Sequence, residues 1–276
     1  MSVACPVTPL VAAGDSERFG GKAAQLATAR RAGLPVPNGW ALGWDDVESL
    51  ALQWTSAPQV GAAVHTALSS CGPVAVRSSA IGEDSGDASF AGAHLTVLGL
   101  VGGDAVLDAI RRVHASAVNP AALAYRERLS VDGAIRMGVV IQQIVDADVA
   151  GVLFTRNPLT GTNELIIEAS WGLGEAVVAG LVTPDHLRVD LNGRILERVL
   201  GEKDIAIRLM ADGSTQEAAV PPDMAERLCL DDDKVRALHT LVRACDAAYA
   251  DTAHDIEFAF AGEALYLLQR RPITHV

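Results

Sequence analysis

Residues 255–274 read DIEFAFAGEALYLLQRRPIT. Two apolar runs alternate with polar residues on either side of a short Gly-Glu turn, which is typical of a β-hairpin. Because successive side chains of a strand point to opposite faces, Asp255 shares a face with Glu257, and Gln269 shares a face with Arg271. The hairpin therefore predicts a place where four polar side chains converge.

Further strands are predicted upstream of this hairpin. The runs RMGVVIQQI at 136–144, GVLFT at 151–155 and ELIIEAS at 164–170 are strand-like, and the last two are joined by the turn-rich RNPLTGTN. Short strands follow around HLRVD, RILERVL and DIAIRLM, and helices then reach about residue 250. This order favours an antiparallel sheet.

The first half of the chain mixes helices and strands. Residues 21–33, GKAAQLATARRAG, have the apolar spacing and the final Gly of a helix. PVAVR at 73–77 is a predicted buried strand, and the Ser- and Gly-rich residues 78–92 are a predicted loop. Residues 103–129 predict two helices, whereas residues 45–72 give no clear pattern.

The composition describes a globular chain with an acidic surface. Half of the 276 residues are hydrophobic, which is enough for one large domain or two lobes. The net charge of -12 and the pI near 4.9 argue against nucleic-acid and membrane partners, which clustered Lys and Arg would bind. No apolar run approaches the ~18 residues of a membrane-spanning helix. The four scattered cysteines form no CxxC pair, and the N-terminus lacks a basic signal region, so we expect a cytoplasmic location.

Two basic residues are candidates for phosphate contacts. Lys22 follows Gly20 and Gly21 at a predicted helix start, where backbone N–H groups and the helix dipole favour an anion. Arg77 ends a predicted strand, and its planar guanidinium can contact two phosphate oxygens. The loop through Gly92 adds hydroxyl and backbone donors. The alternative for each basic residue is a side chain with its head group in water.

The C-terminal hairpin offers a candidate metal site. Carboxylate and amide oxygens on adjacent strands can share a hard cation such as Mg²⁺ with substrate phosphates, and Glu257 and Gln269 are the chosen pair. A cross-strand hydrogen bond is the alternative for this pair. Arg271 lies on the same face and can neutralise charge that develops on a transferring phosphoryl group.

Two more polar residues lie at predicted strand ends. Glu168 precedes SWGLGE, where a carboxylate could meet a ribose hydroxyl or a metal-bound water, and an ordinary surface glutamate is the alternative. Gln142 ends a strand whose edge could pair with an adenine, although plain sheet pairing explains it equally well. The seven histidines show no i, i+4 or HExxH spacing, so no histidine metal cluster is expected.

Five phrases resemble the nucleotide-binding domain shared by phosphoenolpyruvate synthase, pyruvate phosphate dikinase and rifampicin phosphotransferase. They are GGKAAQLATARRAGLPVPNGWAL at 20–42, VAVRSSAIGEDSGDASFAGAH at 74–94, IQQIVDADVAGVLFTRNPLTG at 141–161, IIEASWGLGEAVVAGLVTPD at 166–185 and DIEFAFAGEALYLLQRRPIT at 255–274. The resemblance implies an α+β, ATP-grasp-like fold with two lobes that close over the nucleotide. The expected lobes are residues 1–135, with the phosphate-covering loop, and residues 136–276, with the metal-binding hairpin.

The resemblance also implies roles for residues of the expected N-terminal lobe and the strand that follows it. Lys22 and Arg77 would hold the phosphates of ATP, and the loop through Gly92 would fold over them. The adenine would be bordered by a short segment represented by Gln142, Ile144 and Val145.

In the C-terminal lobe, the resemblance places Glu168 near the ribose and the triphosphate. Glu257 and Gln269 would ligate Mg²⁺, and Arg271 would contact the transferred phosphates. The residues expected to act in catalysis are Lys22, Arg77 and Arg271.

In that family, ATP phosphorylates a histidine on a separate swivelling domain, which carries the phosphoryl group to an acceptor. The present sequence contains no TSHAA-like carrier motif, and His94 is interpreted as a loop residue. We therefore expect an ATP-dependent phosphotransferase component that transfers a phosphoryl or pyrophosphoryl group to a histidine of a partner protein, with an unknown small molecule as the final acceptor. The alternatives are a direct small-molecule kinase or ATP-grasp ligase, and a nucleotide-binding regulatory module without turnover.

Overall fold

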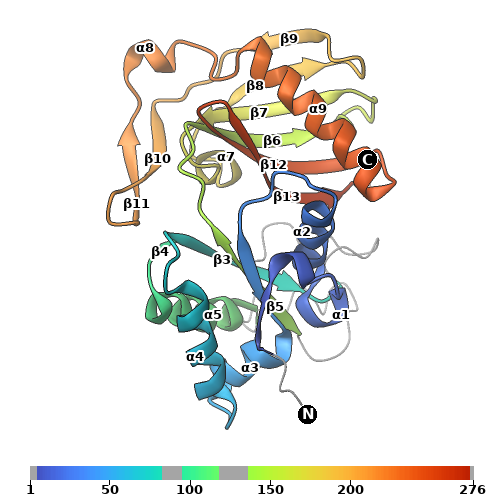
Figure 1. Ribbon diagram of the computed structural model, residues 1–276. Coiled ribbons are helices and arrows are strands. Elements are labelled where there is room, and N and C mark those ends of the chain that lie inside the picture. Colours follow the sequence, from blue (N-terminus) through green and yellow to red (C-terminus); the bar gives the residue numbers. More distant parts are fainter. Residues whose placement is uncertain (1–4, 83–94, 118–135, 274–276) are drawn as a thin grey trace. The chain divides into compact units, whose positions relative to one another are not determined.

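The computed structural model describes residues 5–82, 95–117 and 136–273 of the chain (Figure 1). These residues form two compact units. Unit 1 consists of Met1–Thr28 and Asn38–Ile144, and unit 2 consists of Ala29–Pro37 and Val145–Val276. The predicted lobes met between residues 135 and 136. The two divisions differ in two places: residues 137–143 pair within the sheet of unit 1, and residues 29–37 of the predicted N-terminal lobe belong to unit 2. The assignment of two closing lobes stays a prediction.

Unit 1 is built on a five-stranded sheet in which all neighbouring strands are antiparallel, with the order β1-β2-β5-β3-β4. Its strands are β1 (Val7–Pro9), β2 (Gly39–Leu42), β3 (Val74–Ala80), β4 (Thr96–Leu100) and β5 (Met137–Gln143). Strands β3 and β5 lie in the interior of the sheet, and nearly all of their residues are buried. This explains why each strand contains a short apolar run, VAV in β3 and VVI in β5, rather than an alternating pattern.

The helical segments of unit 1 account for most of the remaining described residues. They are the 3₁₀ helix Leu10–Ala12, α1 (Ser16–Phe19), α2 (Gly21–Arg31, which ends in unit 2), α3 (Trp44–Leu52), α4 (Ala57–Leu68) and α5 (Gly103–Ala117). The predicted helix at 21–33 is confirmed as α2. The unassigned residues 45–72 contain α3 and α4, and the second helix expected within 103–129 lies outside the described residues.

The core of unit 1 lies between one face of this sheet and the helices α3, α4 and α5. In α4, Val60, Val64 and Leu68 recur at the four-residue spacing of one helix face and are buried in this core. Val74 and Val76 of β3 point into the same core. Since side chains alternate along a strand, Arg77 and Ser79 point to the opposite face of the sheet.

Unit 2 is built on a six-stranded antiparallel sheet with the order β13-β12-β6-β7-β8-β9. Its strands are β6 (Val149–Phe154), β7 (Leu165–Trp171), β8 (Asp185–Val189), β9 (Ile195–Val199), β12 (His254–Ala261) and β13 (Ala264–Pro272). The antiparallel sheet and the C-terminal hairpin predicted from the sequence are confirmed, and with unit 1 they give an α+β fold.

One face of the six-stranded sheet is covered by the long helix α9 (Asp232–Tyr249), as Figure 1 shows. Lys234 of α9 lies over the ring of Phe260, and Asp246 of α9 lies 3.1 Å from His254 Nε2. His254 and Phe260 both belong to β12 and lie six positions apart, so their side chains share the face that α9 covers. The odd-numbered residues of β12, including Asp255 and Glu257, therefore lie on the opposite face of the sheet.

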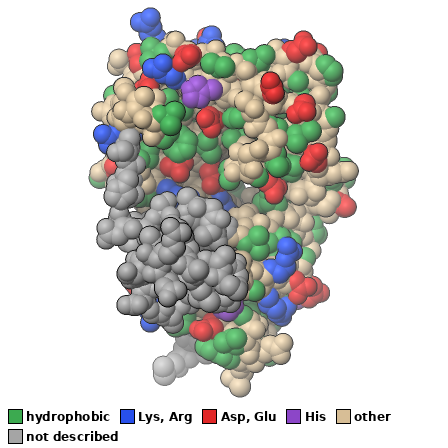
Figure 2. Space-filling view, turned by 180° about the vertical axis from the view of Figure 1, so that it is seen from behind, with side chains coloured by type: hydrophobic (Ala, Val, Ile, Leu, Met, Phe, Trp, Pro, Cys, Tyr) green, Lys and Arg blue, Asp and Glu red, His purple; other side chains and the backbone are tan. Residues whose placement is uncertain are grey.

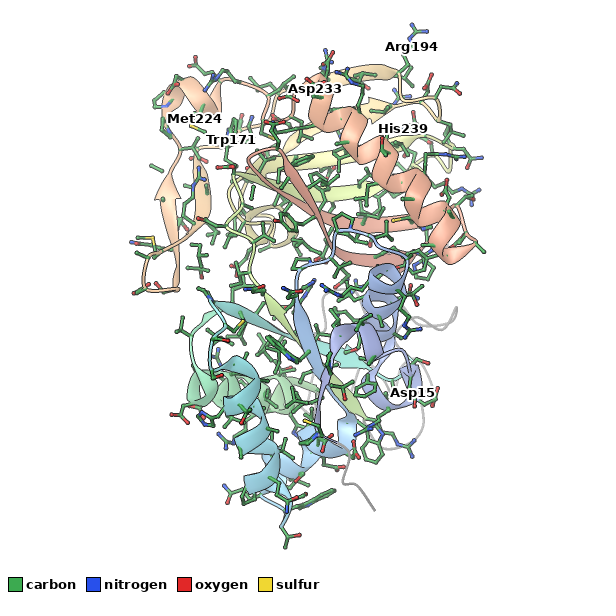
Figure 3. The ribbon with its side chains drawn as sticks, viewed as in Figure 1. Asp15, Trp171, Arg194, Met224, Asp233 and His239 are labelled. Carbon is green, nitrogen blue, oxygen red and sulfur yellow. The ribbon has the colours of Figure 1, made fainter. Side chains whose placement is uncertain are left out.

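Unit 2 also contains a separate two-stranded hairpin of β10 (Ile205–Leu209) and β11 (Thr215–Ala219). The short helices of unit 2 are α7 (Glu175–Val178) and α8 (Pro222–Ala225). Figure 3 shows Trp171 next to Met224, and the Trp171 indole N–H donates to the Met224 carbonyl oxygen at 3.1 Å. Strand β11 was not predicted, because its residues TQEAA are mostly polar and exposed.

The surface of the described residues agrees with the acidic composition. On the face shown in Figure 2, acidic side chains are spread widely and the basic side chains form no large continuous patch among the described residues. Within the described ranges, no helix is long and apolar enough to cross a membrane. The four cysteines are free thiols.

Candidate functional site

The N-terminus of α2 is bound to strand β3 in unit 1. Gly20 has a φ of +83°, and a Cβ atom at this position would lie 2.0 Å from the Ser79 carbonyl oxygen, so only glycine fits here. The Ala23 backbone N–H donates to Ser79 Oγ at 3.1 Å. Lys22 is buried, and its Nζ donates to the Ser78 carbonyl oxygen at 2.7 Å. The expectation of a lysine at a helix start is confirmed, and the ammonium group is held against β3 rather than extended into water.

Arg77 lies within β3, not at its end. The sequence predicted a loop from residue 78, but Ser78 and Ser79 pair with Val139 and Gly138 of β5. That prediction was wrong for residues 78–80, because ladder pairing with a distant strand leaves no local signal in a Ser-Ser-Ala run. Arg77 is buried, so its guanidinium is fixed by the sheet of unit 1.

Gln142 of β5 holds this arginine. Arg77 Nη1 donates to Gln142 Oε1 at 3.0 Å, and both side chains are less than a tenth exposed. The Ile144 backbone N–H, one of the positions expected to border adenine, donates to the Pro73 carbonyl oxygen at 3.0 Å. Val145 begins the second segment of unit 2. Gly92, the end of the expected covering loop, and His94 lie outside the described residues.

In unit 2, the register of the sheet places three of the predicted residues in one row. Glu257 is opposite Gln269 on one side and opposite Val152 on the other, and Val152 is in turn opposite Glu168. His186 of β8 is opposite Glu168. Directly opposed residues of antiparallel strands point to the same face, so this row crosses five strands on the face that α9 leaves uncovered.

The next row of this face contains Asp255 and Arg271, which are opposite each other. The pKa of Asp255 is raised to about 6, because its carboxyl group is buried and lies near Glu257, while Arg271 acts in the opposite direction. The sequence places Asp255 on this face but does not single it out as a site residue. The alternation of DIEF was the signal that could have added it.

The residues of this face fit a divalent cation. Asp255 and Glu257 supply carboxylates, and Gln269 supplies an amide oxygen, which are the ligand atoms that Mg²⁺ prefers. Burial and mutual repulsion of the two carboxylates raise the pKa of Asp255, and a bound cation would relieve this repulsion. No group of three or more His, Cys, Asp or Glu side chains with metal-binding geometry occurs in the described ranges, so the fit depends on the glutamine.

A residue that the sequence reasoning missed contacts Glu168. His186 Nδ1 lies 3.6 Å from Glu168 Oε1, and the two side chains are 35% and 39% exposed. The histidines were judged only by metal-ligand spacing along the chain, and that criterion cannot detect a cross-strand neighbour. The alternation along HLRVD, which places His186 and Arg188 on one face, was the available signal.

The two sets of residues are of different kinds. Unit 1 brings together Lys22, Arg77 and Gln142, which offer cationic and amide donors of the type that hold phosphate oxygens. Unit 2 places Glu168, Glu257, Gln269 and Arg271 on one sheet face, with oxygen ligands for a hard cation beside a guanidinium. The first set has the chemistry that a phosphorylated ligand would need, and the second set has the chemistry that a divalent cation would need.

Comparison with known proteins identifies the family. Residues 45–276 match the family described as "Pyruvate phosphate dikinase, AMP/ATP-binding domain". The chain is 44% identical over 203 residues to a probable phosphoenolpyruvate synthase of Methanothermobacter thermautotrophicus, an alignment that covers 73% of this chain and 29% of that protein. It is 38% identical over 221 residues to a rifampicin phosphotransferase of Streptomyces sp, covering 78% of this chain and 25% of that protein. The chain belongs to the family of pyruvate phosphate dikinase AMP/ATP-binding domains.

The chain spans less than a third of the length of each of these two relatives. Among solved structures, the ATP-grasp ligase PsnB resembles it with a TM-score of 0.37 and 15% identity, over 94% of this chain and 52% of that one. ATP-grasp is the fold type expected from the sequence.

Proposed function

We propose that the chain is the ATP-binding component of a phosphotransferase and moves a phosphoryl or pyrophosphoryl group from Mg-ATP to a histidine of a partner domain or protein. The observation that supports this most is the pair of polar rows in unit 2, where Glu257, Gln269, Asp255 and Arg271 share one sheet face in a member of an AMP/ATP-binding family. Burial, followed by the neighbouring Glu257, raises the pKa of Asp255 to about 6, and shifted pKa values of this kind cluster at functional sites.

Lys22 and Arg77 are the proposed phosphate ligands. Both are buried and held by short hydrogen bonds, Lys22 to a backbone carbonyl of β3 and Arg77 to Gln142. Positive groups that are fixed before the ligand arrives need no reorganisation when charge develops on the phosphates. Gly92 would contribute a backbone donor, and the segment of Gln142, Ile144 and Val145 would border the adenine.

Glu257 and Gln269 are the proposed ligands of magnesium, with Asp255 beside them. When bound, the cation supplies charge neutralisation and fixes the orientation of the phosphate oxygens. Arg271 is the proposed contact of the transferred phosphates. Its effect should be greatest when negative charge develops on the transferring group. Glu168, two strands away from Glu257 in the same row, is the proposed partner of the ribose.

A carrier histidine and a final acceptor are also proposals. The relatives that share this domain are named as phosphoenolpyruvate synthase and rifampicin phosphotransferase, and each is more than three times as long as the aligned region. The acceptor is therefore proposed to be a small molecule handled by other domains or by a partner protein. A cytoplasmic location remains part of the proposal.

The first test is calorimetric titration with ATP in the presence and absence of Mg²⁺. Wild type should bind ATP more tightly with Mg²⁺, and Glu257→Gln should lose most of this enhancement, because the amide cannot supply the charge of the carboxylate. Glu263→Gln is the matched control, since Glu263 belongs to the turn of the same hairpin and is exposed. Equal behaviour of the two variants would reject the metal assignment.

The second test separates the proposed reaction from its alternatives. The chain is incubated with Mg-ATP, with and without candidate proteins that carry a histidine motif, and the nucleotides are then analysed. AMP or ADP formed only with such a protein supports the histidine relay. Product formed with a small-molecule acceptor alone supports a direct kinase or ligase. Tight binding of ATP without any product supports a regulatory module and contradicts the proposed transfer.

A further inference from the structure

His186 extends the polar row of unit 2 beyond the residues assigned so far. The row runs through Gln269, Glu257, Val152, Glu168 and His186, each directly opposite the next. His186 therefore points to the same face as Glu168 and stands beside it on the neighbouring strand.

The side chains of His186 and Glu168 lie close enough to act together. Nδ1 of His186 and Oε1 of Glu168 are 3.6 Å apart. This is longer than a direct hydrogen bond, and a water molecule or a small rotation of either side chain would join the two groups. Distances of this type are often long in the free protein and shorten when the ligand binds.

The backbone that presents His186 is rigid. The preceding residue, Asp185, is fully buried on the opposite face and accepts hydrogen bonds from Lys203 Nζ at 2.5 Å and from the backbone N–H of Cys229 at 2.7 Å. The Gly201 backbone N–H donates to the same carboxylate at 2.9 Å. Neighbouring residues of a strand point to opposite faces. The hydrogen bonds that hold Asp185 on one face therefore also fix the backbone position from which the His186 side chain projects on the other face.

We propose that His186 is a positioning residue that holds the Glu168 carboxylate for the hydroxyl groups of the ribose. This inference rests on the proposed function, in which Glu168 meets the ribose. An exposed histidine and glutamate pair contributes little to stability, so the role of His186 is to reduce the number of orientations that the carboxylate can adopt before the nucleotide binds.

The test compares two nucleotides that differ only at the ribose. Titrations with Mg-ATP and with the magnesium complex of 2′,3′-dideoxy-ATP are made on wild type, His186→Ala and His186→Gln. We expect His186→Ala to raise the dissociation constant for ATP by about fivefold, and to leave that for dideoxy-ATP unchanged. His186→Gln retains a side-chain N–H donor, and it should restore most of the affinity for ATP.

His239→Ala is the matched control. His239 lies on α9, contacts the Leu191 carbonyl oxygen and is also partly exposed (Figure 3). It should change the affinity for neither nucleotide. Equal losses of both nucleotides in His186→Ala, or no loss at all, would overturn the inference.

The same titrations distinguish failure of the inference from failure of the proposed function. If wild type binds no ATP, the proposed function fails and the role of His186 fails with it. If wild type binds ATP and Glu168→Gln weakens ATP but not dideoxy-ATP, the ribose assignment holds. An unchanged His186→Ala would then reject the positioning role alone.

Discussion

Each unit buries one lysine that follows a glycine within two positions, and the two lysines are held in different ways. In unit 1, Lys22 of the phrase GGK is 6% exposed and donates to the neutral carbonyl oxygen of Ser78. In unit 2, Lys203 of the phrase GEK has a fully buried side chain and pairs with the equally buried carboxylate of Asp185. The two phrases look alike, yet the Lys203 ammonium group pairs with a buried carboxylate, whereas the Lys22 ammonium group donates to a backbone carbonyl oxygen of β3.

The difference shows how burial alone should be interpreted. A buried ammonium group that is matched by a buried carboxylate belongs to the architecture, since each charge compensates the desolvation of the other. The hydrogen bond to Ser78 holds the ammonium group of Lys22 in one place on β3, which suits a residue proposed to contact phosphates. The comparison can be tested by removing each charge and measuring stability and ligand affinity separately.

The largest effect is expected for Lys203→Met. This substitution keeps the volume but leaves Asp185 as an uncompensated buried charge, so the free energy of unfolding should fall by about 3–5 kcal/mol. Urea denaturation measures it. Lys234→Met is the control, because the carboxylates near Lys234 belong to the exposed residues Asp231 and Glu263. Its loss should be below about 1 kcal/mol, and similar losses in both variants would contradict the structural role of Lys203.

A smaller effect is expected for Gly20→Ala, which disturbs the backbone that places Lys22. The positive φ and the close approach to the Ser79 carbonyl together should cost about 2 kcal/mol or more of stability. Gly33→Ala is the matched control, since Gly33 has a φ of +78° and no atom within 4 Å of the position that a Cβ atom would occupy. It should lose only the conformational part, about 1 kcal/mol. If thermal denaturation shows equal losses, the close approach to β3 is not what requires glycine at this position.

Lys22→Met should affect binding more than folding. If Lys22 contacts phosphates, the dissociation constant for Mg-ATP should rise by about tenfold or more, equivalent to ~1.4 kcal/mol. The free energy of unfolding should fall by less than is expected for Lys203→Met, because a hydrogen bond such as that of Lys22 to Ser78 contributes about 1 kcal/mol. Calorimetric titration and urea denaturation of the same sample give the two values. A large loss of stability with unchanged affinity would place Lys22 in the same category as Lys203.

The smallest effect concerns Asp46 of α3, a carboxyl group that is less completely compensated than Asp185. Burial, followed by the nearby Asp45, raises the pKa of Asp46 from 3.8 to about 6, and Arg18 at 3.3 Å opposes this shift. Because the folded pKa is the higher one, the native state binds the proton more tightly. The contribution of protonated Asp46 to the free energy of unfolding is therefore complete below the ordinary pKa of 3.8, and it is lost as the pH rises through about 6.

Asp46→Asn removes this titration. As the pH rises from 4.5 to 7, the free energy of unfolding of the variant should therefore increase relative to that of wild type. The increase should be about 1 kcal/mol or less, because the group is partly exposed. Urea denaturation at the two pH values measures the change. A stability difference that is independent of pH would show that the carboxyl group titrates normally.

The parts of the structure that the sequence predicts correctly are those with a local signal. The alternation of DIEFAF and ALYLLQRRP around a turn predicts both strands of the hairpin and the shared face of Asp255 and Glu257, all of which the structure confirms. The apolar spacing of residues 21–31 likewise predicts α2. These patterns depend on neighbours within a few positions along the chain.

The parts that it misses depend on residues far apart in the sequence. The pairing of Ser78 with Val139 extends β3 into an expected loop, and the approach of His186 to Glu168 joins two strands. Lys203 meets Asp185 because the chain between them reverses direction, and the local sequence around either residue does not predict this contact. Such interactions exist only after the sheet has formed. The predicted roles in binding and transfer stay predictions, because they concern a ligand rather than the fold.

The register of β12 and β13 also limits how the gene for this domain can change in length. Adding or removing a single codon within either strand, β12 or β13, would turn the residues of that strand beyond the change to the side covered by α9. The irregularity between Glu257 and Phe258, where Leu268 is the additional residue of β13, already absorbs one such step. Insertions and deletions tolerated by evolution should therefore concentrate in the turns, such as that at Gly262 and Glu263, and should occur in even numbers within the strands themselves.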